Sequence, residues 1–235
     1  MGGIRLPFPA CLIAEKGCID RHDLRLLRSC TFVDGIQTYD AARLLVALNG
    51  QCPDRCPDWP GFFVESLSTF IVHTTAPYGE IDALKSAWLI RTISVDGIID
   101  DPMHLELLVH AMERASTYPE PLSLLALDQL RHAFADTPAG AHHARRPRHA
   151  GITEFDLAFI WQVLRPCVQN GKLLLTAAEA AVLQLVDRRV TRSGNHPGWN
   201  EVMQHEIVQR PATSLRPMPW MMITETPTGS VNYAA

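Results

Sequence analysis

Residues 94–101 read SVDGIIDD and lie between two segments whose apolar residues recur at helical spacing, 88–93 and 105–112. Gly97 can adopt the left-handed backbone conformation that ends a helix. An aspartate shortly after such a glycine caps the next helix by accepting hydrogen bonds from its free amides. The stretch therefore predicts two helices joined by a tight glycine turn.

The same local pattern, a glycine followed shortly by aspartate or threonine, recurs along the chain. The first two pairs of glycines are each separated by 18 residues and the third pair by 20. Self-similarity of this kind is typical of internally repeated structures. We predict three helix–glycine turn–helix hairpins, whose glycines are Gly17 and Gly35, Gly79 and Gly97, and Gly151 and Gly171.

A longer similarity joins the first and the last hairpin. Residues 38–49, TYDAARLLVALN, align with residues 176–187, TAAEAAVLQLVD, and each segment is followed by a Pro-x-Trp. Trp59 and Trp199 thus occupy matched places. Large aromatic side chains are usually buried, so we predict that both pack in the core, with ligand stacking as the alternative.

The fold class that follows is all-α, built from repeated hairpins with about nine helices and no substantial sheet. Extended structure is expected only as short pieces after the glycines. The helices are predicted at 20–31, 38–49, 59–72, 82–94, 101–114, 119–135, 153–165, 176–189 and 198–209.

Composition shifts suggest where the chain divides. We predict an N-terminal extension over 1–16, a helical domain with two hairpins over 17–135, and a third hairpin plus final helix over 151–209. Between the last two, residues 136–150 read DTPAGAHHARRPRHA, which is typical of a linker. The prolines, serines and threonines of 210–235 indicate a weakly ordered tail.

Three residues of this tail are unusual for a disordered segment. Trp220, Met221 and Met222 are large and apolar, and they follow one another directly. Docking of these residues on the body of the protein or on a partner is the alternative to disorder.

Bulk composition excludes several classes. The 235 residues are 47% hydrophobic and 20% charged, with a formal net charge of −4, which is typical of a globular protein and gives no basic field for nucleic acid. No run of eighteen apolar residues is present, so no transmembrane helix is expected. The N-terminus matches no targeting signal, and we predict a cytoplasmic location. The six cysteines are expected to be reduced thiols.

Several of these segments resemble known helical proteins. The turns VDGIQT (33–38) and VDGIID (95–100) resemble those of TerB-like tellurite-resistance domains and of degenerate EF-hands. WPGFFVESL (59–67), the segment 87–113 and LTAAEAAVLQL (175–185) are similar to a group of uncharacterised, mostly alphaproteobacterial proteins with this layout. The resemblance implies an all-helical fold, a link to stress responses at the membrane, and metal binding through acidic residues.

A divalent cation is the ligand that these turns suggest. Asp96, Asp100, Asp101 and Glu106 could supply oxygens to a hard cation. An EF-hand loop also needs a bidentate carboxylate at its twelfth position, and with Asp96 at the fifth position that place is taken by Met103. Capping of helices by these aspartates is therefore the preferred interpretation, and weak divalent-cation binding is the alternative.

Catalytic motifs are missing from the sequence. It contains no nucleophile elbow, no phosphate-binding loop and no dinucleotide fingerprint. His142, His143 and His149 lie among arginines and could bind phosphate or a transition metal, but a solvated linker is the preferred interpretation. We assign no catalytic residue and no cofactor.

Three hypotheses follow, in order of preference. The first is a non-catalytic helical module that binds a protein partner, in a setting linked to stress or the envelope only through the TerB resemblance. The second is a weak divalent-cation sensor. The third is an enzyme, for which the discriminating observation is a histidine or cysteine and a carboxylate within hydrogen-bond reach in a cleft. The sequence leaves the oligomeric state open.

Overall fold

A computed structural model of the chain describes residues 8–169, 172–204 and 208–209. These residues are mostly helical, which confirms the all-α class. The α-helices are α1 (Ala10–Lys16), α2 (Arg21–Leu26), α3 (Tyr39–Gln51), α4 (Trp59–Thr69), α5 (Ala83–Ile93), α6 (Pro102–Arg114), α7 (Glu120–Ala133), α8 (Gly140–Arg145), α9 (Glu154–Leu164), α10 (Ala177–Arg189) and α11 (Pro197–Gln204).

Shorter elements extend or connect these helices. One π-helical turn follows α2 (η1, Leu27–Thr31) and another follows α4 (η2, Phe70–Thr74), while η3 (Arg165–Cys167) and η4 (Arg192–Gly194) are 3₁₀ turns. The strands are β1 (Cys18–Ile19), β2 (Asp54–Arg55), β3 (Val168–Gln169), β4 (Lys172–Leu175) and β5 (Val208–Gln209). β1 pairs in parallel with β2, and β4 pairs with antiparallel β3 and parallel β5.

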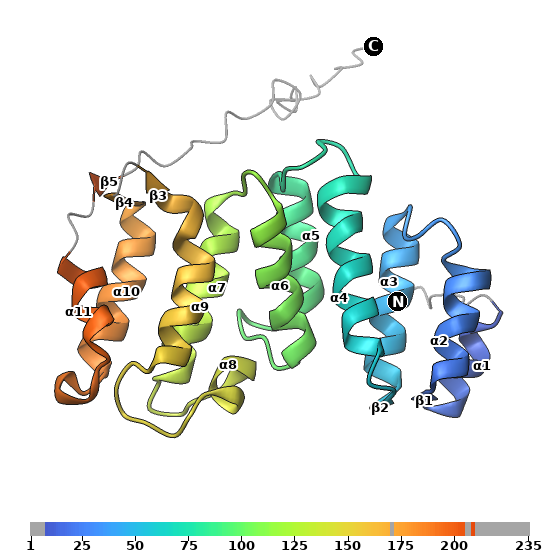
Figure 1. Cartoon of the computed structure of the whole chain (residues 1–235), viewed down its shortest axis with the longest axis horizontal. Coiled ribbons are helices and arrows are strands. Elements are labelled where there is room, and N and C mark those ends of the chain that lie inside the picture. Colours follow the sequence, from blue (N-terminus) through green and yellow to red (C-terminus); the bar gives the residue numbers. More distant parts are fainter. Residues whose placement is uncertain (1–7, 170–171, 205–207, 210–235) are drawn as a thin grey trace, which may run out of the picture.

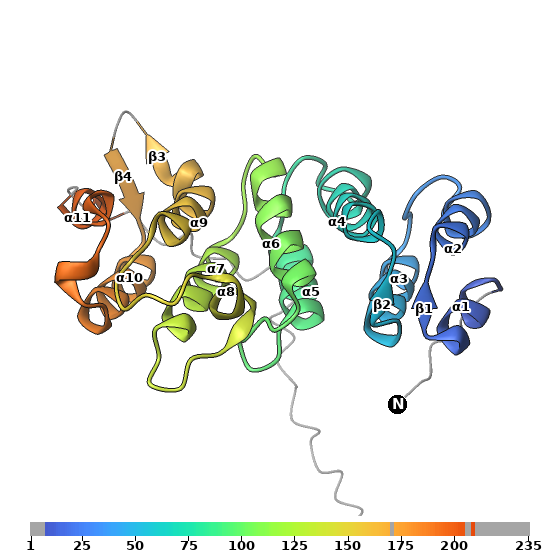
Figure 2. The same cartoon turned by 60° about the horizontal axis from the view of Figure 1, so that its bottom comes forward.

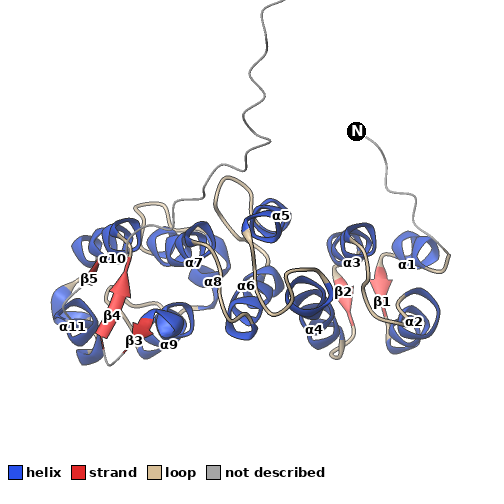
Figure 3. Cartoon of the chain, turned by 90° about the horizontal axis from the view of Figure 1, so that it is seen from above, coloured by secondary structure: helices blue, strands red, loops and turns tan. Residues whose placement is uncertain are grey.

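The helices form an elongated array that runs from α1 at one end to α10 and α11 at the other (Figure 1). Seen from above, α1, α3, α5, α7 and α10 form one layer, and α2, α4, α6, α9 and α11 form the other (Figure 3). α4 packs on α6 and α7 packs on α10. Helices bury an apolar stripe only against another element, so an inner helix of such an array is covered more completely than a terminal one.

One hydrophobic core runs along the interface between the layers, from Ala10 to Trp199. Both Trp59 and Trp199 are fully buried, which confirms that they are core residues. An aromatic cluster joins α3, η2 and α5. The centre of the Tyr39 ring lies 5.1 Å from that of Phe70 and 5.2 Å from that of Trp88.

An α-helix overlaps each of the nine predicted ranges, and α1 and α8 are additional. The end of the last range, predicted as helix, is strand β5 at Val208–Gln209. Threonines or aspartates cap the starts of six helices by accepting from backbone amides, as the sequence pattern predicted. At the 94–101 stretch the cap is Asp101 and not Asp100. Of the six predicted turn glycines, Gly17, Gly35, Gly79 and Gly97 have positive φ angles, Gly151 does not, and Gly171 lies outside the described residues.

Residues 94–101 form a tight turn that is also bound by a residue of another helix. Asp96 and Gly97 both have positive φ, 51° and 79°, and Val95 and Ile98 pair across them. Gln129, buried on α7, accepts from the Ile99 amide and donates to the Gly97 carbonyl. The turn therefore joins α5 and α6 and is also fastened to α7.

Two parts of the predicted domain division need correction. The N-terminal extension contains α1, whose Ala10 and Ile13 belong to the core. The expected linker 136–150 contains α8, which packs on α7 and α6. Both helices are too short to show a periodic pattern in the sequence, and long-range packing decides their structure. The predicted tail, 210–235, lies outside the described residues.

Candidate functional site

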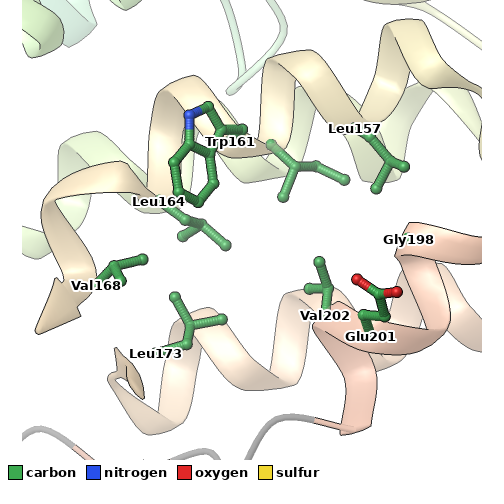
Figure 4. A pocket seen from close by; sticks show the side chains of 9 residues that line it. Leu157, Trp161, Leu164, Val168, Leu173, Gly198, Glu201 and Val202 are labelled. Carbon is green, nitrogen blue, oxygen red and sulfur yellow. The ribbon is translucent and has the colours of Figure 1, made fainter. Parts of the chain in front are cut away.

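An open apolar pocket lies between α9 and α11, at the end of the array. Its volume is about 300 Å³. β4 lies between the two helices and contributes Leu173 (Figures 2 and 4). The lining residues are Leu157, Ile160, Trp161, Leu164, Val168, Leu173, Gly198, Glu201 and Val202.

The α9 wall follows from helical spacing. Leu157, Ile160, Trp161 and Leu164 stand at positions i, i+3, i+4 and i+7, so they share one face of the helix. Ile160 and Leu164 are buried, but 59% of Trp161 is exposed. An exposed tryptophan at the edge of an apolar pocket is a common feature of protein interfaces.

The α11 wall is fixed to the body by hydrogen bonds at its start. The Trp199 indole N–H donates to Asp187 Oδ1 on α10 at 2.8 Å. Just before α11, Asn195 Oδ1 accepts from the Ile152 amide at 2.8 Å. Gly198 lies close to α9, because a Cβ there would approach Leu157 Cδ1 to 3.1 Å. The N-terminal ends of α9 and α11 are therefore held together.

The matched helix α4 shows why a pocket remains here. Aligning Trp59 with Trp199 places Phe62 opposite Val202. The Phe62 ring fills the space toward η1, 6.2 Å from the Phe32 ring and 5.0 Å from the Arg28 guanidinium carbon. Valine is several carbon atoms smaller than phenylalanine, so the corresponding space beside α11 is open.

The chemistry of this pocket favours binding over catalysis. Glu201 is the only ionisable group among the described residues that line it. A single carboxylate has no second acid, base or nucleophile beside it to share a reaction. The remaining walls are apolar, so the pocket suits a buried aromatic, aliphatic or thioether side chain.

A second, smaller cavity of about 240 Å³ lies between α6, α8 and α9, and His142 lines it together with Glu106, His110 and Glu113. His142 is 1% exposed, and its Nε2 lies 2.9 Å from Asp156 Oδ1. His142 Nδ1 is buried without a hydrogen-bond partner among the described residues. A histidine and a carboxylate therefore meet beside a cavity.

Asp156 is nevertheless committed to holding helices together. Its carboxylate accepts from Arg146 Nε and Nη2, each at 3.1 Å, and from the amide and hydroxyl of Thr153. Burial alone raises the pKa of the Asp156 carboxyl, but the hydrogen bonds from His142, Arg146 and Thr153 outweigh it and hold that pKa below its usual range. The group joins α8 to the start of α9.

This network corrects the prediction of a solvated linker. His142 and the Arg146 side chain are buried, and the Arg146 guanidinium lies 4.1 Å above the Phe134 ring. The pattern missed them because their partners Phe134 and Asp156 lie outside the segment. His143 and His149 are exposed, as a solvated segment would have them.

The four predicted cation ligands have different surroundings. Asp101 caps α6 through Oδ1 and accepts from Asn49 Nδ2 through Oδ2. Glu106 lies on the outer face of α6, 3.4 Å from Arg145. Asp96 and Asp100 are exposed on the turn. Within the ranges described, no three side chains of histidine, cysteine, aspartate or glutamate are grouped as a metal site would require.

No helix in the described part of the chain is long and apolar enough to cross a bilayer. Comparisons with protein-family models, curated proteins and solved structures gave no match. The TerB resemblance therefore stays a prediction from the sequence.

Sequence reasoning did not find the pocket. The helical spacing of Leu157, Trp161 and Leu164 gave an apolar face on α9, but an apolar face normally predicts core. The available signal was the valine at the position matched to Phe62, which only the alignment of the two segments could have shown.

Proposed function

We propose that the chain is a non-catalytic helical interaction module that binds a protein segment in the pocket between α9 and α11. The observation that carries this proposal is the open apolar pocket edged by Trp161, which is 59% exposed. Covering this side chain removes apolar area from water and stabilises a complex by roughly 25 cal/mol for each Å² buried.

The pocket also suggests the chemistry of the partner. A cavity of about 300 Å³ takes one large side chain, such as an aromatic ring or a methionine. Glu201 at the wall favours a basic residue close to that anchor. We therefore expect the partner to present an aromatic or methionine side chain beside an arginine or lysine.

Photocrosslinking in the cells that produce the chain tests the proposal. The variant Trp161→p-benzoylphenylalanine places the reactive group at the pocket, and Leu84→p-benzoylphenylalanine places it on an exposed residue of α5 as a control. We expect a protein adduct from position 161 only, with the crosslink at an aromatic or methionine residue of the partner.

A second substitution makes this test specific for the cavity. Val202→Phe, added to the position-161 variant, fills the pocket with the side chain that α4 carries at the matched position. The yield of the protein adduct should then fall at least about fivefold, because the phenylalanine ring occupies the space that the partner's side chain needs. An adduct that persists, or equal adducts from positions 84 and 161, would contradict the proposal.

The internal repeat is part of this proposal. Its support is that Trp59 donates to Asn49 and Trp199 donates to Asp187, and these acceptors were already aligned in the sequence. Membership in a TerB-like family, a stress-linked or envelope-linked role and a cytoplasmic location stay predictions.

The two alternatives keep their own tests. For the divalent-cation sensor, titration calorimetry with calcium, magnesium and zinc should give heat that Asp96→Asn and Asp100→Asn abolish, and no heat at millimolar ion would exclude it.

For the enzyme, the candidate catalytic residues are the pair His142 and Asp156. Asp156 already has its oxygens engaged by Arg146 and Thr153, which favours a structural role.

A further inference from the structure

The described chain ends beside the pocket. β5 runs in parallel to β4, with Val208 opposite Leu174 and Gln209 opposite Leu175. Leu173, which precedes these residues on β4, lines the pocket. The segment that follows Gln209 therefore starts within a few residues of the apolar walls.

That segment carries side chains of the size and type that the pocket accepts. Residues 217–223 read PMPWMMI and contain Trp220 with three methionines. Arg216 lies just before them, and Glu201 is the only ionisable group among the described lining residues. An apolar anchor preceded by a basic residue is the ligand that the pocket chemistry suggests.

The connection is long enough to allow this contact. Trp220 follows Gln209 by eleven residues, which span up to roughly 36 Å when extended. Helix α9 has 11 residues and is therefore about 16 Å long. Trp220 can reach any part of the pocket without moving β5.

We propose that residues 220–222 of the same chain cover the pocket between α9 and α11, with one large side chain, that of Trp220, inside it. A tether of this length gives the segment an effective concentration in the millimolar range, which favours binding within one chain over binding between two copies. Where the pocket also binds a partner, which rests on the proposed function above, the tail competes with that partner.

Crosslinking from the tail tests the contact directly. The purified full chain with Trp220→p-benzoylphenylalanine is irradiated, and crosslinked peptides are mapped by mass spectrometry. We expect crosslinks within one chain to peptides that contain 157–164 or 198–202. Thr228→p-benzoylphenylalanine is the matched control in the same tail and should give at least about fivefold less of this product.

Any one of the following crosslinking outcomes overturns the proposal. They are crosslinks from position 220 to other parts of the chain, crosslinks between two chains, and equal yields from positions 220 and 228. Adding Val202→Phe should lower the position-220 product as well, and an unchanged yield would also contradict occupation of the pocket.

Hydrogen exchange gives an independent measurement. In the variant W220A/M221A/M222A, amides of 157–164 should exchange at least about threefold faster than in the variant T226A/T228A/S230A, because α9 loses its cover. Equal rates would show that the tail does not cover α9.

The two proposals can fail separately. If the tail crosslinks to the pocket but no partner adduct forms in cells, the pocket serves the tail alone. If a partner adduct forms and the tail does not crosslink, competition by the tail is excluded. If both hold, W220A/M221A/M222A should raise the partner adduct from position 161 at least about threefold.

Discussion

The helix pairs α3–α4 and α10–α11 begin alike and end differently. Threonine caps the first helix of each pair, and in each the tryptophan of the second helix donates from its indole nitrogen to a residue near the end of the first. In α3–α4 the acceptor is Asn49, fully buried, which also donates to Asp101 before α6. In α10–α11 the acceptor is Asp187, whose side chain is 25% exposed.

The difference follows from position in the array. α4 packs on α6 on one side, and its Phe62 packs on Phe32 on the other. Asn49 of α3, which accepts from Trp59, is also linked to Asp101 before α6. α11 is the last helix that the structure describes, and Val202 leaves a pocket where α4 has a ring. The same sequence pattern therefore gives a filled contact inside the array and an open pocket at its end.

Replacing either of the two tryptophans should give the largest losses in the free energy of unfolding. The two losses show which helix pair depends more on its tryptophan. Trp59→Ala should lower the free energy of unfolding by about 4 kcal/mol and Trp199→Ala by about 3 kcal/mol, because both leave cavities but Trp59 also leaves Asn49 without its donor inside the core. Urea unfolding measures both, with Leu84→Ala, at an exposed residue of α5, as control. A larger loss at Trp199 would reverse the comparison.

The network around Asp156 tests how firmly α9 and the helices that follow it are joined to the rest of the array. Asp156→Asn should lower the free energy of unfolding by about 3 kcal/mol at pH 7, because it removes the charge that pairs with buried Arg146. Hydrogen exchange should rise in α9 and α10 more than in α3 and α4. Equal changes at both ends would mean that the array unfolds as one unit.

The same substitution has a defined pH dependence. The pKa of Asp156 is lower in the folded protein than its unfolded value of about 3.9, so its contribution is complete above that pH and is lost as the pH falls toward the folded pKa. The difference between the parent and Asp156→Asn should be constant from about pH 8 to 5 and shrink below about pH 4. Asp40 is exposed, so the free energy of unfolding of Asp40→Asn should differ little from that of the parent at any pH in this range.

Exchanging the two acceptors separates buried from exposed polar contacts. Asn49→Asp places a carboxylate beside Asp101 in the core and should cost about 2 kcal/mol, whereas Asp187→Asn keeps an acceptor for Trp199 and should cost less than about 0.5 kcal/mol. Thermal unfolding of the two variants is sufficient to compare them. Equal losses would mean that Asp187 is as constrained as Asn49.

The smallest effects are expected from exchanging the ring and the valine. Phe62→Val should lower the free energy of unfolding by about 1.5 kcal/mol by opening a cavity. Val202→Phe should leave it within about 0.5 kcal/mol, since the new ring enters existing space. Circular dichroism during urea unfolding measures both. A strong loss from Val202→Phe would show that the pocket cannot accept a ring.

The helices were predictable because periodicity and caps are local signals. Thr38, Thr153 and Thr176 begin helices where the sequence placed them. α8 was missed because six residues carry no measurable period, and its place depends on the contact of His142 with Asp156. Local pattern gives the elements, but not the partner that makes a short element stable.

The candidate site was less predictable than the fold. The acidic residues of the 94–101 turn suggested a cation site because hard cations prefer oxygen ligands. In the folded chain Asp101 accepts from Asn49 and from the Met103 amide of α6, and Glu106 accepts from Arg145. The pocket instead exists because small side chains leave space between α9 and α11. The packing of two helices against each other cannot be read from one sequence.

A positive charge sits deep inside the array, where it holds the loop before α5. Lys85 is 2% exposed, and its ammonium donates to the carbonyls of Thr75, Pro77 and Glu80 at 2.5–2.7 Å. Burial lowers the pKa of this amine. The chain has three lysines in all, so acylation of Lys85 by an amine-reactive reagent can be followed separately. The rate of this acylation would measure how often the loop opens locally.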